Sequence, residues 1–575
     1  MPSRLPQRVG LVLLATLALI ACSGSGKRVE DTGGPSSGPV VVLGPAVKVR
    51  PEDAVEGARS AVLVAARNEF ESFQIAIRAT DAPLRNVTVS LAQPLTGPGG
   101  GALPASNVTV YREDYYPVTT PSSPEGAPGR WPDALIPSVD PLFGEARSAF
   151  PLEVPAGENR VAWIDVLVPE SARPGVYRGT LEVRGDGLAE SVPVELTVLA
   201  FALPSTASLK TAFTISSDTC TPLDIDGCSS DPTLPARVRQ LFVRTALDNR
   251  LSLGRPHALP VNDGIGVEQF REHFLPFVRG TAATRLPGAA LSTYQVNLIT
   301  ERNLTGFKAE AEADGFVDRA FVWSCDEPDL GENWPHCEDV LRADSEAWPQ
   351  VPKLVTAPIN TVTAGALPLI DIMVVNVTLL DGAVETREYA GNQRPKYDEF
   401  LGNGARPKEL WLFSACGSHG CAENADASTA GMAGGYQIDA PPSQTRAMAW
   451  LAFGYEASGL LYYETALRLS SAWDDQLAAG GNGDGTLFYP GTVARIGGTR
   501  AIPLESLRLK YLRDGLEDYE YLKYLRDHGQ AADAQRIARE LFPATYDTSR
   551  SDAQIAAARL ELARRVADLT GGPEP

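Results

Sequence analysis

The sequence predicts a multidomain protein, in which an N-terminal β-sandwich is followed by a (β/α)8, TIM-like barrel with a C-terminal helical extension. Three observations support this fold class. Residues 40–204 consist of β-type runs separated by turns, residues 205–530 alternate between apolar strands and helical segments, and residues 531–575 have a helical pattern. The 575 residues leave room for several domains of about 150 residues each. A hydrophobic content of 44% is typical of a globular chain.

Residues 1–22 are expected to be a lipoprotein signal peptide. Arg4 and Arg8 precede an apolar run that is too short to span a bilayer comfortably. The run ends in Leu-Ile-Ala followed by Cys22, which resembles a bacterial lipobox, whose cysteine is lipidated and becomes the mature N-terminus. The alternative is an ordinary secretory signal in which Cys22 has no role. Residues 23–39 are rich in Ser, Gly and Pro, as expected of a flexible linker.

This N-terminus predicts a location in the bacterial cell envelope, either periplasmic or at the outer membrane and cell surface. The mature protein would be anchored to the membrane through the lipid on Cys22 and would not span it, because no later segment is long and apolar enough for a transmembrane helix. Nucleic acid is not expected as a partner. The chain has 51 basic and 71 acidic residues, a net charge of −20, and no dense Lys/Arg patch to bind phosphates.

Cysteine usage agrees with export. After Cys22 the chain has six more cysteines, which fall into three close pairs in the sequence. Six cysteines allow many connectivities, but short loops close most easily. We therefore predict three disulfides: Cys220–Cys228, Cys325–Cys337 and Cys416–Cys421. The alternative, a zinc site, lacks the CxxC spacing typical of such sites, so neither a metal nor another cofactor is expected.

Residues 40–204 are expected to form the β-sandwich. Runs such as 72–77 and 161–166 are rich in β-branched and aromatic residues, which favour strands. Turn signals such as Pro174-Gly175 separate these runs, and the segment has no convincing helical period. A succession of short strands without helices predicts two packed sheets.

The pattern changes after Pro204, where apolar strands begin to alternate with helical stretches such as 235–249 and 445–454. The expected strands are 210–216, 251–253, 293–299, 320–324, 353–357, 371–377, 409–414 and 459–464. Eight strands with intervening helices predict a (β/α)8 barrel. The residues from 503 onward recur with helical spacing and are interpreted as the last barrel helix followed by a small helical appendix, residues 531–575.

Asp326 and Glu327 directly follow the fourth predicted strand of the barrel. Catalytic groups of such barrels lie at the C-terminal ends of the strands. Two carboxylates are also the minimum equipment for hydrolysing a glycosidic bond. The alternative is a turn in which both acids only terminate the strand. Their placement at the end of a predicted barrel strand favours a catalytic role.

The adjacency of these acids indicates a particular mechanism. Neighbouring residues of a strand tend to point to opposite faces, so they do not suit two carboxylates that flank one bond about 5–5.5 Å apart. They suit substrate-assisted catalysis, in which one acid protonates the leaving oxygen and the other orients a nucleophile of the substrate, such as a 2-acetamido carbonyl. A glycosidase with two separated carboxylates stays open as an alternative, and Glu464, at the end of the eighth strand, is then the better second acid.

Further polar and aromatic residues near the strand ends are candidates for substrate binding. Asparagines at or after strand ends can hydrogen-bond sugar hydroxyls, and aromatic rings can wall a sugar pocket. Loop capping and core packing are the alternative roles for all of them. The candidates are His257, Asn297, Asn360, Asn376, Tyr436, Tyr463 and Trp473.

Several segments together resemble family-123 glycoside hydrolases. They are the SCDEP block at 324–328, the GDGTLFYPG run at 483–491 and the helical segment 506–522, while 68–74 and 168–179 resemble the accessory β-domain of that family. The resemblance covers residues 40 to 530. It implies an N-terminal β-domain and a catalytic barrel, as the residue patterns also predict.

The resemblance implies a β-N-acetylgalactosaminidase-like activity on glycans. Terminal β-linked N-acetylhexosamine residues would be cleaved by substrate-assisted, retaining catalysis. In that mechanism Glu327 is the general acid/base and Asp326 orients and polarises the acetamido group. A general acid near neutral pH needs a raised pKa, which burial supplies. The alternative function is a non-catalytic carbohydrate-binding or surface-structural lipoprotein that uses the barrel as a scaffold.

Overall fold

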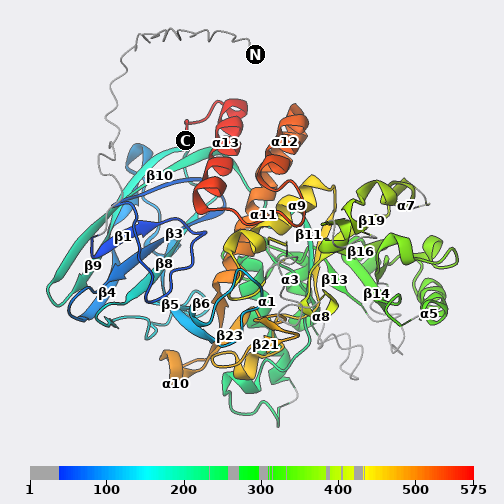
Figure 1. Ribbon diagram of the computed structural model, residues 1–575, viewed down its shortest axis with the longest axis horizontal. Coiled ribbons are helices and arrows are strands. Elements are labelled where there is room, and N and C mark those ends of the chain that lie inside the picture. Colours follow the sequence, from blue (N-terminus) through cyan, green and yellow to red (C-terminus); the bar gives the residue numbers. More distant parts are fainter. Residues whose placement is uncertain are drawn as a thin grey trace, which may run out of the picture.

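The computed structural model describes residues 38–575 except 232, 257–270, 297–308, 310, 314, 332, 384–388, 403, 405, 420–430, 433 and 435. The N-terminal sheets lie on one side of the molecule, in blue and cyan, and the barrel strands on the other, in green and yellow (Figure 1). The C-terminal helices, in orange and red, end the chain beside strand β10 (Figure 1). Among the described residues, no helix has both the length and the apolar character needed to cross a membrane.

Two β-sheets build the N-terminal domain. The five-stranded sheet has the order β2 (Ala61–Arg67), β10 (Leu188–Ala202), β9 (Gly175–Gly185), β4 (Leu84–Thr96), β7 (Leu152–Val154). The seven-stranded sheet has the order β1 (Val40–Leu43), β3 (Glu69–Arg78), β8 (Asn159–Val168), β5 (Val108–Val118), β6 (Gly129–Pro137), β24 (Ile502–Ser506), β23 (Phe488–Gly491). Ile75 and Ile164 of one sheet share an apolar core with Leu181 and Leu196 of the other. The two sheets therefore form a sandwich.

The two last strands of the seven-stranded sheet come from the far end of the chain. β23 and β24 form a hairpin, and β24 pairs with β6 through Glu505 opposite Leu135 and Ser506 opposite Ala134. The prediction that residues 205–530 all belong to the barrel is therefore wrong for this hairpin. No strand was predicted at 488–491, and residues 503–506, predicted to be helical, belong to β24, so that the helix begins only at Leu507. Pairing with a strand this far away in the chain is not set by local patterns.

The barrel strands are all parallel. Their order is β12 (Leu253–Pro256), β11 (Lys210–Ile215), β20 (Gly459–Tyr462), β19 (Glu409–Phe413), β16 (Ile372–Asn376), β15 (Lys353–Thr356), β14 (Ala320–Asp326), β13 (Tyr294–Gln295). β12 and β13 lie side by side, and their described residues form no ladder pairs, so the described barrel is nearly closed. Each of the eight strands forms where the sequence predicts one.

The second strand begins two residues later than expected. Residues 251–253 were assigned to it, but the chain first has to end the preceding helix. Arg250 adopts a left-handed backbone with φ 62°, and the N–H of Leu251 donates to the carbonyl of Ala246 in that helix. The strand therefore starts at Leu253.

Helices separate many of the barrel strands. Two of them, α1 and α9, form close to the predicted helices 235–249 and 445–454. The helices within the barrel are α1 (Leu234–Asp248), α3 (Leu275–Arg279), α5 (Trp334–Ala347), α6 (Val377–Leu380), α7 (Asp398–Gly402), α8 (Cys416–His419) and α9 (Pro442–Gly454). The connection between β15 and β16, all of which is described, contains only 3-10 turns at Ile359–Thr361 and Leu367–Leu369. The helical layer around the barrel is therefore incomplete at this point.

Apolar side chains fill the inside of the barrel. They come from β11, β14, β15, β16, β19 and β20, and are Ala212, Phe321, Leu354, Ile372, Val374, Trp411, Phe413 and Leu461. Side chains at alternate positions of each strand make this cluster, so a residue's place in the alternation tells whether it faces the interior. Because the interior is packed, a substrate site has to lie at a mouth of the barrel.

The segment after the hairpin forms a buried helix and two further helices. They are α11 (Leu507–Leu525), α12 (Ala531–Leu541) and α13 (Asp552–Thr570), with a π-helical turn at Arg526–Gln530. Charged side chains of α11 are buried against the sandwich, where Arg508 pairs with Asp133 at 2.7 Å and Arg513 with Asp165 at 3.0 Å. The segment 506–522, one of those that carry the family resemblance, thus packs against the sandwich, and α11 also contacts α9 of the barrel.

Candidate active site

A β-bulge sets the direction of the acidic pair. In β14, Trp323 is paired with Leu354, but the next partners are Cys325 with Val355 and Asp326 with Thr356. The extra residue in β14 shifts the alternation by one position. Leu354 belongs to the cluster inside the barrel, and Thr356, two residues later, is on the same face. Asp326 is therefore brought to the interior side at the C-terminal end of its strand, where strict alternation would have placed Cys325.

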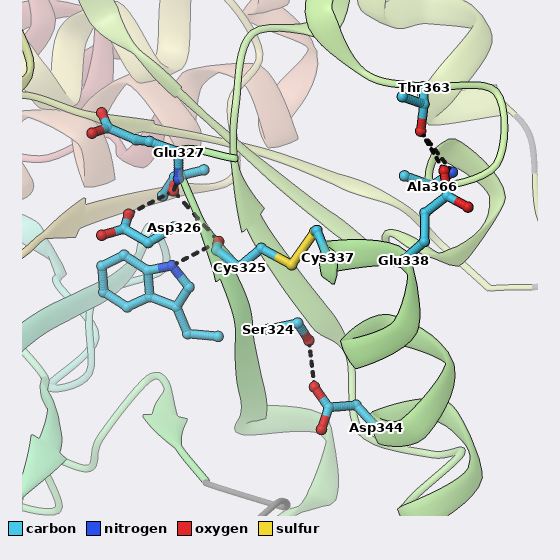
Figure 2. Close-up of a disulfide and its surroundings, with 11 residues drawn as sticks. Ser324, Cys325, Asp326, Glu327, Cys337, Glu338, Asp344, Thr363 and Ala366 are labelled. Carbon is cyan, nitrogen blue, oxygen red and sulfur yellow. Dashed lines mark hydrogen bonds between the residues drawn. A yellow bond between two sulfur atoms is a disulfide. The ribbon is translucent and has the colours of Figure 1, made fainter. Parts of the chain in front are cut away.

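The residues of the bulge itself face the opposite way, toward helix α5. Cys325 forms a disulfide with Cys337 of α5, and Ser324 Oγ donates a hydrogen bond to Asp344 Oδ2 of the same helix at 2.7 Å. Figure 2 shows both contacts on the α5 side of the strand and the carboxylates of Asp326 and Glu327 on the other. The disulfide therefore holds the strand end that carries the two acids.

Of the other predicted disulfides, Cys220–Cys228 is formed. Cys416 is also disulfide-bonded, while Cys421 lies outside the described residues. Cys220 and Cys416 follow barrel strands and Cys325 lies at the end of β14, so all three disulfide-bonded cysteines are near the C-terminal mouth of the barrel.

Thr356 links the two acids through its side chain. Glu327 leaves the strand with φ 43°, a left-handed backbone that is uncommon for residues other than glycine. Its N–H donates to Thr356 Oγ1 at 2.8 Å and to the Thr356 carbonyl at 3.1 Å. Thr356 Oγ1 in turn donates to Asp326 Oδ1 at 2.7 Å. The turn that carries Glu327 and the side chain of Asp326 are thus fixed by one hydroxyl group.

A cavity of about 160 Å³ lies beside Glu327 at the C-terminal ends of β14, β15, β16 and β19. Its size is small compared with the ~300–1,000 Å³ of pockets for drug-sized ligands. Polar groups and apolar or aromatic walls both contribute to it. The lining residues are Glu327, Asp329, Leu330, Thr356, Ala357, Pro358, Asn376, Leu379, Tyr389, Phe413 and Ser418.

Burial raises the pKa of Glu327 above its ordinary value, and the negative charges of Asp326 and Asp329 raise it further. A hydrogen bond from Ser418 opposes this effect but does not cancel it. Burial also raises the pKa of Asp329. Glu327 therefore tends to keep its proton, which is the state that a general acid needs. Asp326 is exposed, and no ion pair involves it in the described part of the chain.

The predicted aromatic site residues lie away from this cavity. Tyr436 is fully buried, and its ring packs edge-on against Tyr462 at 4.8 Å. Tyr463 donates from its hydroxyl to Asp484 Oδ2 at 3.0 Å. Trp473 packs against Tyr489 of the sandwich hairpin, with ring centroids 4.9 Å apart. None of the three predicted rings is among the residues that line the cavity.

Of the predicted polar residues, Asn376 lines the cavity and Asn360 does not. Asn376 also caps helix α6, because its Oδ1 accepts from the N–H of Thr378 at 3.1 Å. Asn360 is exposed on the 3-10 turn after β15. His257 and Asn297 lie outside the described residues.

The alternative second acid, Glu464, has a different environment. It is 3% exposed, and it accepts hydrogen bonds from the N–H groups of Ser216, Thr465 and Ala466. It does not line the cavity. These contacts tie the chain after β20 to the end of β11, which is a structural role.

Sequence reasoning missed several residues of the cavity. Asp329 belongs to the same acidic turn as Glu327, so its position in the sequence was a usable signal. Thr356 and Phe413 end their strands on the interior face, and their strand positions indicated that orientation. Ser418, in the short helix α8 after β19, had no such signal. Among the described residues, no group of three or more His, Cys, Asp or Glu side chains is arranged to hold a metal ion.

Comparison with known proteins agrees with this architecture. Residues 47–185 match the family model of the glycoside hydrolase 123 N-terminal domain. The whole chain is similar in fold to a family 123 glycoside hydrolase from Clostridium perfringens studied for glycolipid glycan hydrolysis, with a TM-score of 0.64 and 12% identity, covering 92% of this chain and 98% of that chain. The N-terminal domain therefore matches that of glycoside hydrolase family 123, and the chain shares its fold with a solved member of that family. The resemblance inferred from the sequence motifs is thereby confirmed.

Another solved structure has only a low similarity to this chain. A protein of unknown function from Porphyromonas gingivalis is 14% identical, with a TM-score of 0.15, and the similarity covers 31% of this chain and 57% of that chain. No curated protein matches the chain significantly.

Proposed function

We propose that this family-123 relative is a glycoside hydrolase in which Glu327 is the general acid/base. The observation that carries the proposal is the environment of Glu327: it lines a small cavity at the C-terminal ends of four barrel strands, and burial raises its pKa. A protonated carboxylic acid in such a place can donate to the oxygen of a leaving alcohol.

Asp326 has the second role in the proposed reaction. Its Oδ1 accepts from Thr356, and its Oδ2 has no hydrogen-bond partner within the described part of the chain. The free oxygen can accept from the N–H of a 2-acetamido group and so turn the carbonyl of that group toward the anomeric carbon. The bulge supports this role, because it orients Asp326 to the interior side of the strand.

The proposed reaction has two steps. First, the acetamido carbonyl oxygen bonds to the anomeric carbon while the glycosidic C–O bond breaks, and Glu327 gives its proton to the departing oxygen. Second, ionised Glu327 takes a proton from a water molecule, whose oxygen attacks the anomeric carbon and reopens the cyclic intermediate. Two displacements on opposite faces return the original β configuration.

The proposed substrate is a terminal β-linked N-acetylhexosamine of the galacto type on a glycan. The relation to family 123 supports this choice, and the relative from Clostridium perfringens is associated with glycolipid glycan hydrolysis. The small volume of the cavity fits recognition of a single sugar ring better than recognition of a long chain.

Matched aryl glycosides test the proposal. We expect hydrolysis of the aryl β-N-acetylgalactosaminide and far less of the aryl β-galactoside, which has a 2-hydroxyl instead of the acetamido group. Glu327→Gln should remove most of the activity on a substrate with a poor leaving group, and NMR should detect the β-anomer as the first product. Equal rates for the wild type and Glu327→Gln on every glycoside would exclude the catalytic assignment.

The non-catalytic alternative is less well supported by the same residues. A protein that kept only the scaffold would have no reason to hold beside the cavity a half-buried glutamate whose pKa is raised. Asp326 is exposed and has no ion pair with any residue that the structure describes, in contrast to an acid kept for structural ion pairing. Binding of glycans without turnover by the wild type would favour this alternative.

The proposed location is the bacterial cell envelope, with a lipid on Cys22. The support for it is the lipobox-like order before Cys22 and the disulfides, which form in oxidising compartments. Labelling of cells with a radioactive fatty acid should mark the full-length wild type but not Cys22→Ser. Equal labelling of both would exclude this anchor.

A further inference from the structure

We propose that Thr356 is a positioning residue for both acids, an inference that rests on the proposed function. Its hydroxyl is the link through which the carboxylate of Asp326 and the backbone of Glu327 are held in one arrangement. Thr356 is 1% exposed, so water does not compete freely for these contacts.

The direction of the hydrogen bonds follows from the donors available. The Glu327 N–H donates to Thr356 Oγ1, so the hydroxyl oxygen is the acceptor of that bond and its own single proton is left to donate. Two acceptors lie within reach: Asp326 Oδ1 at 2.7 Å and the Cys325 carbonyl at 3.5 Å. The Cys325 carbonyl already accepts from Trp323 Nε1 at 3.1 Å. The proton therefore belongs to the shorter bond, toward Asp326.

This direction makes Asp326 Oδ1 an acceptor and leaves Oδ2 for the substrate. It also fixes which oxygen of Asp326 faces the barrel wall. Without the hydroxyl, the carboxylate of an exposed aspartate can rotate about its side-chain bonds and lose its alignment with the acetamido N–H.

The second effect of Thr356 is on the backbone of Glu327. A non-glycine residue in the left-handed region is strained and persists only where surrounding contacts hold it. At its N–H, Glu327 is held by two bonds to Thr356, one to the hydroxyl and one to the carbonyl, while its own carbonyl accepts from the Leu330 N–H. Loss of the hydroxyl removes one of the two and allows the general acid to move relative to Asp326.

The bulge explains why this residue holds the position. It brings Asp326 into register with Thr356, so that the hydroxyl lies between the side chain of one acid and the N–H of the next. A strand without the bulge would pair a different residue with Thr356. The bulge and the threonine therefore position the two acids together.

Thr356→Val and Thr356→Ser are the informative variants, because valine keeps the shape without the hydroxyl and serine keeps the hydroxyl. Thr211→Val is the matched control: Thr211 is a fully buried barrel threonine at the start of β11, whose Oγ1 accepts from the Ser252 N–H at 2.8 Å. Thr211 is at the N-terminal end of its strand, whereas Asp326 and Glu327 are at the C-terminal end of theirs, so Thr211 cannot act on the acids.

Steady-state kinetics on the aryl β-N-acetylgalactosaminide give the first readout. We expect Thr356→Val to lower kcat by about 100-fold, as small misplacements of catalytic groups do, with a much smaller change in KM. Thr356→Ser should keep most of the activity, and Thr211→Val should keep kcat unchanged. Equal kcat for Thr356→Val and the wild type would overturn the proposal, and so would a loss of kcat in Thr211→Val as large as that in Thr356→Val.

Amide hydrogen exchange gives a second readout that does not need activity. The Glu327 amide should exchange faster in Thr356→Val than in the wild type, and Thr356→Ser should restore its protection. If the wild type hydrolyses no glycoside, the proposed function fails, and exchange alone then decides whether Thr356 holds Glu327. Unchanged protection at Glu327 in Thr356→Val would overturn the positioning role in either case.

Discussion

Glu113, in strand β5 of the sandwich, is the buried acid from which the clearest stability prediction follows. It is 1% exposed, and neither of its carboxylate oxygens has a hydrogen-bond partner in the described part of the chain. Burial raises its pKa to about 8, and the negative charge of Asp133 adds to the effect. Glu113 is therefore protonated in the folded protein at neutral pH. We predict that Glu113→Gln, which has nearly the same shape and cannot ionise, stabilises the protein at alkaline pH.

The sign and size follow from proton linkage. The folded state binds the proton of Glu113 more tightly than the unfolded state, whose carboxyl titrates near 4.5. The free energy of unfolding therefore falls as the pH rises from about 4.5 to about 8. A pKa difference of this size corresponds to at most roughly 5 kcal/mol. Relative to Glu113→Gln, the wild type should lose up to that amount across the window.

Urea unfolding of both proteins at pH 5 and at pH 8.5 provides the assay. Because Glu71 and Glu517 also have raised pKa values, the pH dependence of the wild type alone is not specific to Glu113. The difference between the variant and the wild type isolates it. We expect a small difference at pH 5 and a stabilised variant at pH 8.5. The same difference at both pH values would refute the reasoning.

Three further predictions concern the site and its supports. Asp329→Asn should move the alkaline limb of the kcat/KM pH profile to lower pH, because the charge of Asp329 raises the pKa of Glu327; an unmoved limb would contradict this. Replacing Cys325 and Cys337 together by serine should lower the free energy of unfolding by about 3 kcal/mol, the value for a short closed loop, and denaturant titration under oxidising conditions would measure it. Arg508→Met should destabilise the protein by about 3–5 kcal/mol, since it leaves a buried carboxylate unpaired; an unchanged melting temperature would speak against that.

Much of the barrel was predictable because its signals are local. Each strand is a short apolar run between helical or turn segments, and Asp326-Glu327 stands directly after one of them. The pairing of β24 with β6 was not predictable in this way, because it depends on a contact between residues far apart in the chain. The same holds for the incomplete helical layer between β15 and β16.

The candidate site was likewise predictable only in part. Glu327 lines the cavity as its position predicts, whereas Tyr436, Tyr463 and Trp473 pack elsewhere. Aromatic residues are used equally for core packing and for sugar contact, so residue type alone does not separate the two. The adjacency of Asp326 and Glu327 in the sequence also does not show which way their side chains point. A bulge in β14 changes which side chains face inward, and no single residue of the sequence marks this bulge.

The hairpin of β23 and β24 has a consequence for the order in which the protein matures. During synthesis or export from the N-terminus, residues 40–202 emerge early, but their seven-stranded sheet lacks its last two strands until residue 506 has followed. Until then β6 is an unpaired edge strand, and Asp133 lacks Arg508, its ion-pair partner in the folded protein. The sandwich, which is the first domain to be synthesised, is thus among the last to be completed. A chain truncated before the hairpin would expose the unpaired edge of β6, which favours aggregation, and would not be a smaller stable protein.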